Sequence, residues 1–168
     1  MKILVFVVFG FMCVSVYAKE TTFILTTAST GVVEKINVKT GQSVKKGQLL
    51  LQLDQRVYKA KLDEAIVVLK STKLEFEEAQ KELERAEELY ERTVLSDHEL
   101  NSAKVEFAKA ESYLAKSKRQ EIEAQYNFDH SQLLAPVSGK IQSIMAFPGM
   151  FVNNQLKDTP LIKFVSIK

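Results

Sequence analysis

Two stretches of sequence decide the fold: GVVEKINVKTGQSVKKGQLLLQ at residues 31–52 and GKIQSIMAFPGMFVNNQ at residues 139–155. They align without a gap when the second is shifted back by 108 positions. A recurrence at a fixed offset is the signature of an internal structural repeat. The shift superposes both glycines and four apolar positions: Gly31 on Gly139, Gly41 on Gly149, Val33 on Ile141, Ile36 on Ile144, Val38 on Ala146 and Val44 on Val152.

Each copy predicts a short strand, a glycine turn and a second strand, because apolar and polar residues alternate on both sides of a glycine. We expect four glycines to act as structural turns: Gly31, Gly41, Gly139 and Gly149. Neither copy can bury its apolar face alone, so the copies should close on each other as a small β-sandwich of about eight short strands. The alternative is two unrelated hairpins.

Residues 55–132, between the two copies, contain no glycine and no proline and are rich in helix-forming residues. Large and small residues recur every seven positions, which predicts two close-packed antiparallel helices of roughly 35 residues and about 50 Å each. The large positions are Leu62, Leu69, Phe76, Leu83, Tyr90, Leu100, Phe107, Leu114 and Phe128; the small ones are Ala65, Thr72, Ala79, Ala86, Ala103, Ala110, Ser117 and Ala124, with an interruption at Glu121.

The turn between the two helices is marked by Ser96-Asp97-His98-Glu99, the sequence of a capping box. The second helix should therefore begin at about Asp97, and the tip of the hairpin should lie near residues 92–96. Ser96, Asp97 and His98 cannot form a catalytic relay, because adjacent residues at a helix start point in different directions.

The first 18 residues have the pattern of a secretory signal peptide: a basic start at Lys2, an apolar segment and small residues near Ala18. The mature chain would begin near Lys19 and would lack the single cysteine, Cys13. The alternative is an uncleaved anchor in the inner membrane. The predicted organisation is α+β, with a β domain split between residues 19–54 and 133–168 and a helical hairpin at 55–132.

The composition excludes several classes of function. The predicted mature chain carries 22 basic and 21 acidic residues, which gives no electrostatic footprint for nucleic acid. Two histidines, no remaining cysteine and no phosphate-binding glycine loop indicate no catalytic, metal or cofactor site. The hairpin is acidic, with 17 acidic and 13 basic residues, whereas the rest of the mature chain has four acidic and nine basic residues.

Three segments together resemble the HlyD-type periplasmic membrane fusion proteins: GQLLLQLD at 47–54, the long hairpin, and LLAPVSGKIQ at 133–142. The resemblance implies a biotinyl/lipoyl-like β-sandwich and a non-enzymatic periplasmic adaptor. Such an adaptor connects an inner-membrane transporter, of a class the sequence does not specify, to a TolC-type outer-membrane channel. The resemblance to this family further implies that identical copies of the chain form a ring. Family members usually add a β-barrel and a membrane-proximal domain, for which the 168 residues leave no room, so we expect a short form. The alternatives are a minimal adaptor, a partner subunit that supplies these domains, and an incomplete reading frame.

The resemblance also implies a docking motif for the outer-membrane channel, an Arg followed by a Leu four residues later and a Ser seven residues after that. Arg85, Leu89 and Ser96 match this spacing near the predicted tip. The alternative roles are an exposed ion pair for Arg85, packing within the hairpin for Leu89 and helix capping for Ser96.

Two other functions remain open at this point. A biotin or lipoate carrier would share the β-sandwich, but its modified lysine lies in a β turn, whereas Lys59 and Lys61 fall in the predicted first helix. A structural coiled-coil protein would bind its partner along the whole hairpin, whereas an adaptor would make contact mainly at the tip.

Overall fold

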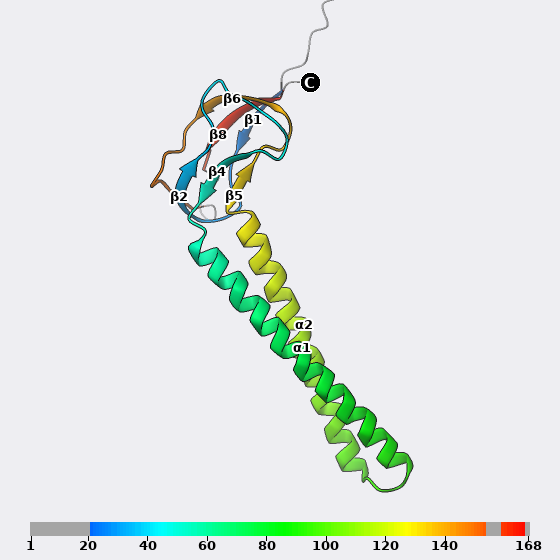
Figure 1. Ribbon diagram of the computed structural model, residues 1–168. Coiled ribbons are helices and arrows are strands. Elements are labelled where there is room, and N and C mark those ends of the chain that lie inside the picture. Colours follow the sequence, from blue (N-terminus) through cyan, green and yellow to red (C-terminus); the bar gives the residue numbers. More distant parts are fainter. Residues whose placement is uncertain (1–20, 154–158, 167–168) are drawn as a thin grey trace, which may run out of the picture.

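The computed structural model describes residues 21–153 and 159–166, which form a β-sandwich and a long helical hairpin that projects from it (Figure 1). The predicted signal peptide lies outside the described residues. None of the helices in the described part of the chain combines the length and apolar character that a membrane span requires.

The sandwich consists of two four-stranded antiparallel sheets, with strand orders β1-β8-β6-β3 and β5-β4-β2-β7. The eight strands of the described residues agree with the number that the repeat predicts. Their bounds are β1 Thr21–Leu25, β2 Gly31–Ile36, β3 Ser43–Val44, β4 Leu49–Leu53, β5 Gln132–Leu134, β6 Gly139–Ile144, β7 Phe151–Val152 and β8 Ile162–Ser166.

The two copies of the repeat exchange strands. In one sheet Val44 of β3 pairs with Gly139 of β6, and in the other Val152 of β7 pairs with Gly31 of β2. These pairs are equivalent under the 108-residue shift, and the strand orders of the two sheets correspond, although β8 follows β4 by 113 residues and not by 108. The copies are therefore two halves of one sandwich, and neither half can complete its sheet without the other.

Apolar residues at matched positions of the repeat fill the core between the sheets. Val33 and Ile141 are almost completely buried, as are Val44 and Val152. Burial of apolar side chains contributes roughly 1.5–3 kcal/mol each, so this core is the main source of stability in the β domain. The other core residues are Val38, Leu50, Leu51, Leu53, Leu133, Ala135, Ala146, Leu161, Ile162 and Phe164.

The glycines of the repeat have two different roles. Gly41 and Gly149 have φ values of 83° and 88°, as a turn requires. Gly31 and Gly139 do not lie in turns, contrary to the expectation from sequence, because each begins a strand. Gly139 is instead a point of close approach: a Cβ atom there would lie 2.2 Å from the carbonyl oxygen of Val165.

Helices α1 (Arg56–Glu91) and α2 (Asp97–Asp129) pack antiparallel along the predicted seven-residue seam. Phe76 and Phe107 contact each other across it, with ring centroids 5.3 Å apart. At the middle of the seam, the hydroxyl groups of Thr72 and Ser117 lie 2.6 Å apart. Tyr90, the last large residue of the predicted seam on α1, is 40% exposed.

The base of the hairpin is fixed to the sandwich at several points. The loop between β1 and β2 satisfies carbonyl groups at the end of α2: Thr27 Oγ1 donates to His130 O (2.7 Å) and Ser29 Oγ donates to Asn127 O (3.2 Å). Gln55 Nε2 donates to Ser131 Oγ at 2.7 Å. Because β4 and β5 are paired strands, both helices leave the sandwich side by side.

Candidate functional site

The first helix ends at the tip of the hairpin in a tight turn. The backbone N–H of Val94 donates to Leu89 O (3.0 Å), and that of Thr93 donates to Tyr90 O (2.9 Å). This pair of bonds is the Schellman motif, which needs a left-handed residue that is usually glycine. Thr93 occupies that position with φ 58°. A β-branched residue is strained there, so the tip has a fixed but strained turn.

The second helix begins with the predicted capping box. Ser96 Oγ accepts a hydrogen bond from the backbone N–H of Glu99 (3.4 Å), and Glu99 Oε2 accepts from the Ser96 N–H (2.9 Å). Ser96 Oγ also donates to Glu99 Oε2 at 2.6 Å. The side-chain and backbone hydrogen bonds from Ser96 lower the pKa of Glu99. The Ser96 side chain therefore acts as the N-cap of α2.

Tyr90 joins the two helices across the tip. Its hydroxyl group donates to Asp97 Oδ1 at 2.7 Å, and this hydrogen bond raises the pKa of Tyr90. The seven-residue pattern assigned Tyr90 to the seam, but a phenol hydroxyl group near the end of a helix can reach a polar partner at the surface. The bond ties the last turn of α1 to the first turn of α2.

Arg85 and Leu89 lie on the same side of α1, one turn apart. Arg85 is exposed and forms an ion pair with Glu82 (3.2 Å). Leu89 is 39% exposed and lies on the wall of a groove of about 280 Å³ between the helices. The groove follows the small seam residues and includes Leu95 and three carboxylates; its lining is Ala79, Glu82, Ala86, Leu89, Leu95, Glu99, Ser102, Ala103 and Glu106.

The structure therefore brings Leu89 and the capping box of Ser96 to one end of the hairpin, with Arg85 one turn back on α1. Sequence reasoning missed Val94, which lies between them and is 69% exposed. A valine in a short polar turn was the available signal, because an apolar side chain with no core beneath it is typical of a contact surface. Leu89 and Val94 give the tip an apolar surface.

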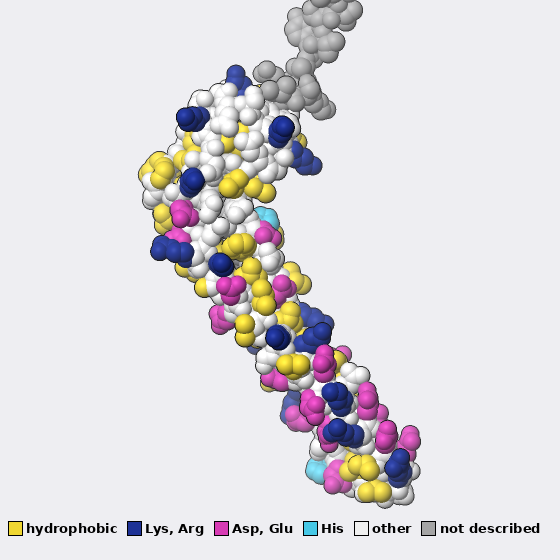
Figure 2. Space-filling view, in the orientation of Figure 1, with side chains coloured by type: hydrophobic (Ala, Val, Ile, Leu, Met, Phe, Trp, Pro, Cys, Tyr) yellow, Lys and Arg dark blue, Asp and Glu magenta, His cyan; other side chains and the backbone are white. Residues whose placement is uncertain are grey.

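The half of the hairpin near the tip is acidic. Residues 74–113 carry 12 acidic and five basic side chains, whereas the parts of the helices nearer the sandwich carry five acidic and eight basic ones. Figure 2 shows hydrophobic side chains along the half of the hairpin next to the sandwich and dense charge in the half towards the tip. Within residues 21–153 and 159–166, no three His, Cys, Asp or Glu side chains are grouped as metal ligands.

Residues 24–163, most of the chain, match the protein family described as RND MFP, barrel-sandwich hybrid domain. The match covers both halves of the sandwich and the hairpin between them. The chain belongs to this family.

Curated relatives carry the names of efflux components. The chain is 32% identical over 101 residues to multidrug resistance protein MdtA of Pectobacterium carotovorum, covering 60% of this chain and 24% of the relative. It is 30% identical over 128 residues to the antibiotic efflux pump periplasmic linker protein ArpA of Pseudomonas putida, covering 76% of this chain and 31% of the relative. The chain thus spans less than a third of the length of these relatives.

Solved structures share the fold. A MacA–MexA chimeric protein containing the Pseudomonas aeruginosa MexA α-hairpin domain has a TM-score of 0.63 at 26% identity, covering 86% of this chain and 46% of that one. The membrane fusion protein Spr0693 of Streptococcus pneumoniae has a TM-score of 0.65 at 19% identity, covering 89% and 60%. The split lipoyl-like sandwich with an inserted hairpin, predicted from the sequence, is confirmed as the fold.

Proposed function

We propose that the chain is part of a periplasmic adaptor that links an inner-membrane transporter to a TolC-type outer-membrane channel for efflux or secretion. The observation that carries this proposal is the family match over residues 24–163, which includes the sandwich, the hairpin and its tip. Relatives named as periplasmic linkers of efflux pumps support the location and the type of process. The adaptor acts by contact, not by catalysis.

The hairpin tip is the contact point with the channel in this proposal. Two helices of 36 and 33 residues place the tip about 50 Å from the sandwich. Leu89 and Val94 offer exposed apolar surface there, and Arg85 offers an exposed cation. The Arg85 ion pair with Glu82 is no obstacle, because an exposed pair contributes about 0–1 kcal/mol and exchanges partners readily.

In this proposal the sandwich mediates self-association of identical copies and lies on the side of the transporter. We assign it residues 19–54 and 133–168, with 55–132 as the hairpin, residues 1–18 as the export signal and a ring of identical copies as the working state. The carrier hypothesis gains no support, because Lys59 and Lys61 lie in the first two turns of α1 and not in a β turn.

Export by cells that lack the chromosomal copy tests the proposal. Arg85→Ala and Leu89→Ala should each lower export of a toxic substrate, measured as drug susceptibility, because both side chains are exposed at the tip. Lys81→Ala and Val68→Ala are matched controls, since they are exposed on α1 farther from the tip and should leave export intact.

Folding must be monitored in the same variants. The melting temperatures of Arg85→Ala and Leu89→Ala should stay close to that of the parent protein, because neither side chain is buried. Full export in both variants would contradict the proposed docking role of the tip. A photo-crosslinking residue at Val94 should capture an outer-membrane protein, and capture along the whole hairpin instead would favour the structural coiled-coil hypothesis.

A further inference from the structure

The lysines of the sandwich gather on one of its two sheets. Residues 21–54, 132–153 and 159–166, the described part of the sandwich, contain six lysines and two acidic residues. Five of the lysines lie in or beside the sheet β1-β8-β6-β3, here called the basic sheet: Lys39, Lys45, Lys46, Lys140 and Lys163. The two acidic residues, Glu34 and Asp54, lie in or directly after strands of the other sheet.

The register of the strands shows which side chains share the outer face of the basic sheet. Lys140 and Lys163 each lie between two buried residues of their own strand, so their side chains point away from the core. Residues that lie directly opposite each other share a face; Lys140 pairs with Ser43, and Lys163 pairs with Ile24. Ile24 is 63% exposed. The outer face therefore combines two cations with a hydroxyl group and an exposed apolar side chain.

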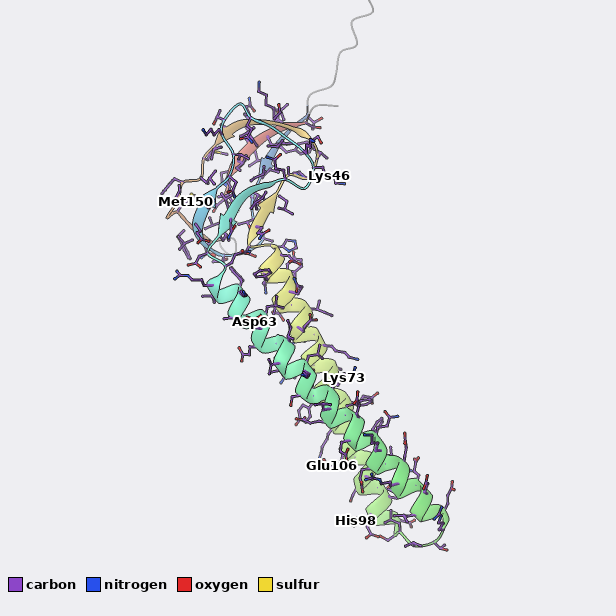
Figure 3. The ribbon with its side chains drawn as sticks, viewed as in Figure 1. Lys46, Asp63, Lys73, His98, Glu106 and Met150 are labelled. Carbon is purple, nitrogen blue, oxygen red and sulfur yellow. The ribbon has the colours of Figure 1, made fainter. Side chains whose placement is uncertain are left out.

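No acidic side chain of the described residues neutralises these lysines. Within residues 21–153 and 159–166, every ion pair lies in the hairpin or at its base. Figure 2 shows Lys and Arg side chains over the visible face of the sandwich, where acidic side chains appear only next to the hairpin. Lys46 lies at the surface of the sandwich in Figure 3. The basic sheet therefore presents its positive charge to solvent.

The internal repeat shows that the fold does not require lysines at these places. Under the 108-residue shift, Lys140 is equivalent to Val32 and Lys39 is equivalent to Phe147. Val32 and Phe147 are 42% and 61% exposed beside the other sheet, so the same backbone positions also accept apolar side chains. The positive charge is therefore specific to one sheet, and it favours a partner of opposite charge.

The basic sheet lies on the side of the sandwich away from the hairpin. In Figure 1 strands β1, β6 and β8 lie far from the hairpin, whereas β2, β4 and β5 lie next to it. The predicted signal peptide ends at Ala18, and β1, an edge strand of the basic sheet, begins at Thr21. The three residue steps between them span at most about 11 Å. While the signal peptide is in the membrane, it therefore keeps this sheet near the lipid surface.

From these observations we propose that the outer face of the basic sheet binds the anionic phospholipid headgroups of the inner membrane. Each lysine close to an anionic lipid surface raises the affinity about fivefold. Ile24 adds apolar contact at the boundary between headgroups and acyl chains. The same surface repels the acidic part of the hairpin, residues 74–113, so the hairpin points away from the membrane.

This inference goes beyond the proposed function and does not depend on docking at the tip. Tryptophan fluorescence tests it, because the chain contains no tryptophan and an introduced one reports alone. The protein as host cells export it is mixed with vesicles of phosphatidylethanolamine and phosphatidylglycerol. The emission of Ile24→Trp should shift to the blue, whereas that of Val32→Trp, exposed on the other sheet, should not. Because the probe reports on the sheet itself, the readout applies whether the signal peptide is cleaved or retained.

Lipid charge and salt make the result specific. The shift should be absent when neutral phosphatidylcholine replaces phosphatidylglycerol, and also in about 1 M salt, where the Debye length is about 3 Å. An equal shift with neutral vesicles would overturn the proposal, because it would show apolar insertion without recognition of charge. A shift of Val32→Trp in place of Ile24→Trp would also overturn it.

Lysine variants test the charges on the face. In the Ile24→Trp background, Lys140→Gln/Lys163→Gln should raise the lipid concentration that gives half of the shift by about 25-fold. Lys35→Gln/Lys81→Gln removes the same charge from outside the basic sheet and should leave that concentration unchanged. An equal loss in the two double variants would overturn the proposal, because it would show a response to net charge alone.

Crosslinking in cells distinguishes a lipid partner from a protein partner. A photo-crosslinking residue in place of Ser43, which lies opposite Lys140 on the outer face, should give phospholipid adducts. Capture of a protein there without lipid would overturn the proposal. If Ile24→Trp fails to respond to anionic vesicles while Arg85→Ala and Leu89→Ala lower export, membrane binding fails and the adaptor function stands. If it responds but both tip variants export normally, docking fails and membrane binding stands.

Discussion

Replacement of Gly139 by alanine should strongly destabilise the sandwich. The backbone of Gly139 does not have a positive φ, so alanine is conformationally acceptable there and should even add roughly 0.4–1 kcal/mol by restricting the unfolded chain. The obstacle is space. The new Cβ atom would lie 2.2 Å from the carbonyl oxygen of Val165 and 2.5 Å from the ring of Phe164, which is fully buried.

The magnitude follows from the movement that the new atom requires. Carbon–oxygen contacts between strands lie at about 3.3 Å or more, so β8 must move by about 1 Å from β6. Such overpacking costs about 1–3 kcal/mol, and weakening one or two ladder hydrogen bonds adds about 1 kcal/mol each. After the gain from the unfolded chain is subtracted, we expect a net loss of about 3 kcal/mol in the free energy of unfolding.

Gly31 provides the matched control, because it occupies the equivalent position in the other half of the repeat. A Cβ atom there would find its nearest neighbour, Leu53 Cδ1, at 3.6 Å, which is an ordinary contact. Gly31→Ala should therefore change stability by less than about 1 kcal/mol.

Hydrogen exchange of the peptides that span β6 and β8 measures the effect without interference from the signal of the helices. Protection in β6 and β8 should fall in Gly139→Ala and stay unchanged in Gly31→Ala. Equal protection in the two variants would refute the close-approach argument, since they differ in the space available for one methyl group.

Three further predictions concern the hairpin and its base. Thr93→Gly should raise the free energy of unfolding by about 1 kcal/mol, and with it the melting temperature, because at φ 58° any Cβ atom lies too close to the following carbonyl oxygen. Thr93→Ala keeps a Cβ atom, so an equal gain from it would contradict this cause. Ser117→Leu should lower the free energy of unfolding by about 1–3 kcal/mol, because the larger side chain overpacks the seam opposite Thr72. Ser71→Leu, on the outer face of α1, should have no such effect. Urea unfolding measures both variants. The side-chain and backbone hydrogen bonds from Arg56 lower the pKa of Asp54 from 3.8 to about 2. Because the folded pKa is the lower one, the stability from this pair is complete above pH 3.8 and is lost as the pH falls through about 2. An NMR titration should give that pKa, and Arg56→Gln should return it toward 3.8.

The repeat and the helical seam were predictable because both rest on short-range pattern. Matched apolar positions such as Val44 and Val152 became core, and the capping box at Ser96 formed where its four residues predicted it. The exchange of strands between the halves was not predictable in the same way. An alignment shows which residues are equivalent, but not that β3 pairs with β6 and not with its own half.

The features that the sequence did not reveal depend on contacts between distant segments. Gly31 and Gly139 are equivalent in sequence, yet only Gly139 faces a bulky buried ring, that of Phe164. Thr27 and Ser29 lie about a hundred residues from the carbonyl groups of α2 that they satisfy. At the tip, Tyr90, the last large residue of the first seven-residue series, donates a hydrogen bond to Asp97 of α2, which the seven-residue pattern does not predict.

The pairing of β4 with β5 has a consequence for the order of folding. Residues 55–132 form a long loop between two strands that must meet, and closing such a loop as a flexible chain would be slow. Helices form on a submicrosecond timescale from local contacts, so the hairpin can assemble before the sandwich. Once it has formed, it holds Leu51 and Leu133 within reach of each other. A hairpin that forms first therefore holds β4 and β5 as close together as a short turn would, although 78 residues separate them in sequence.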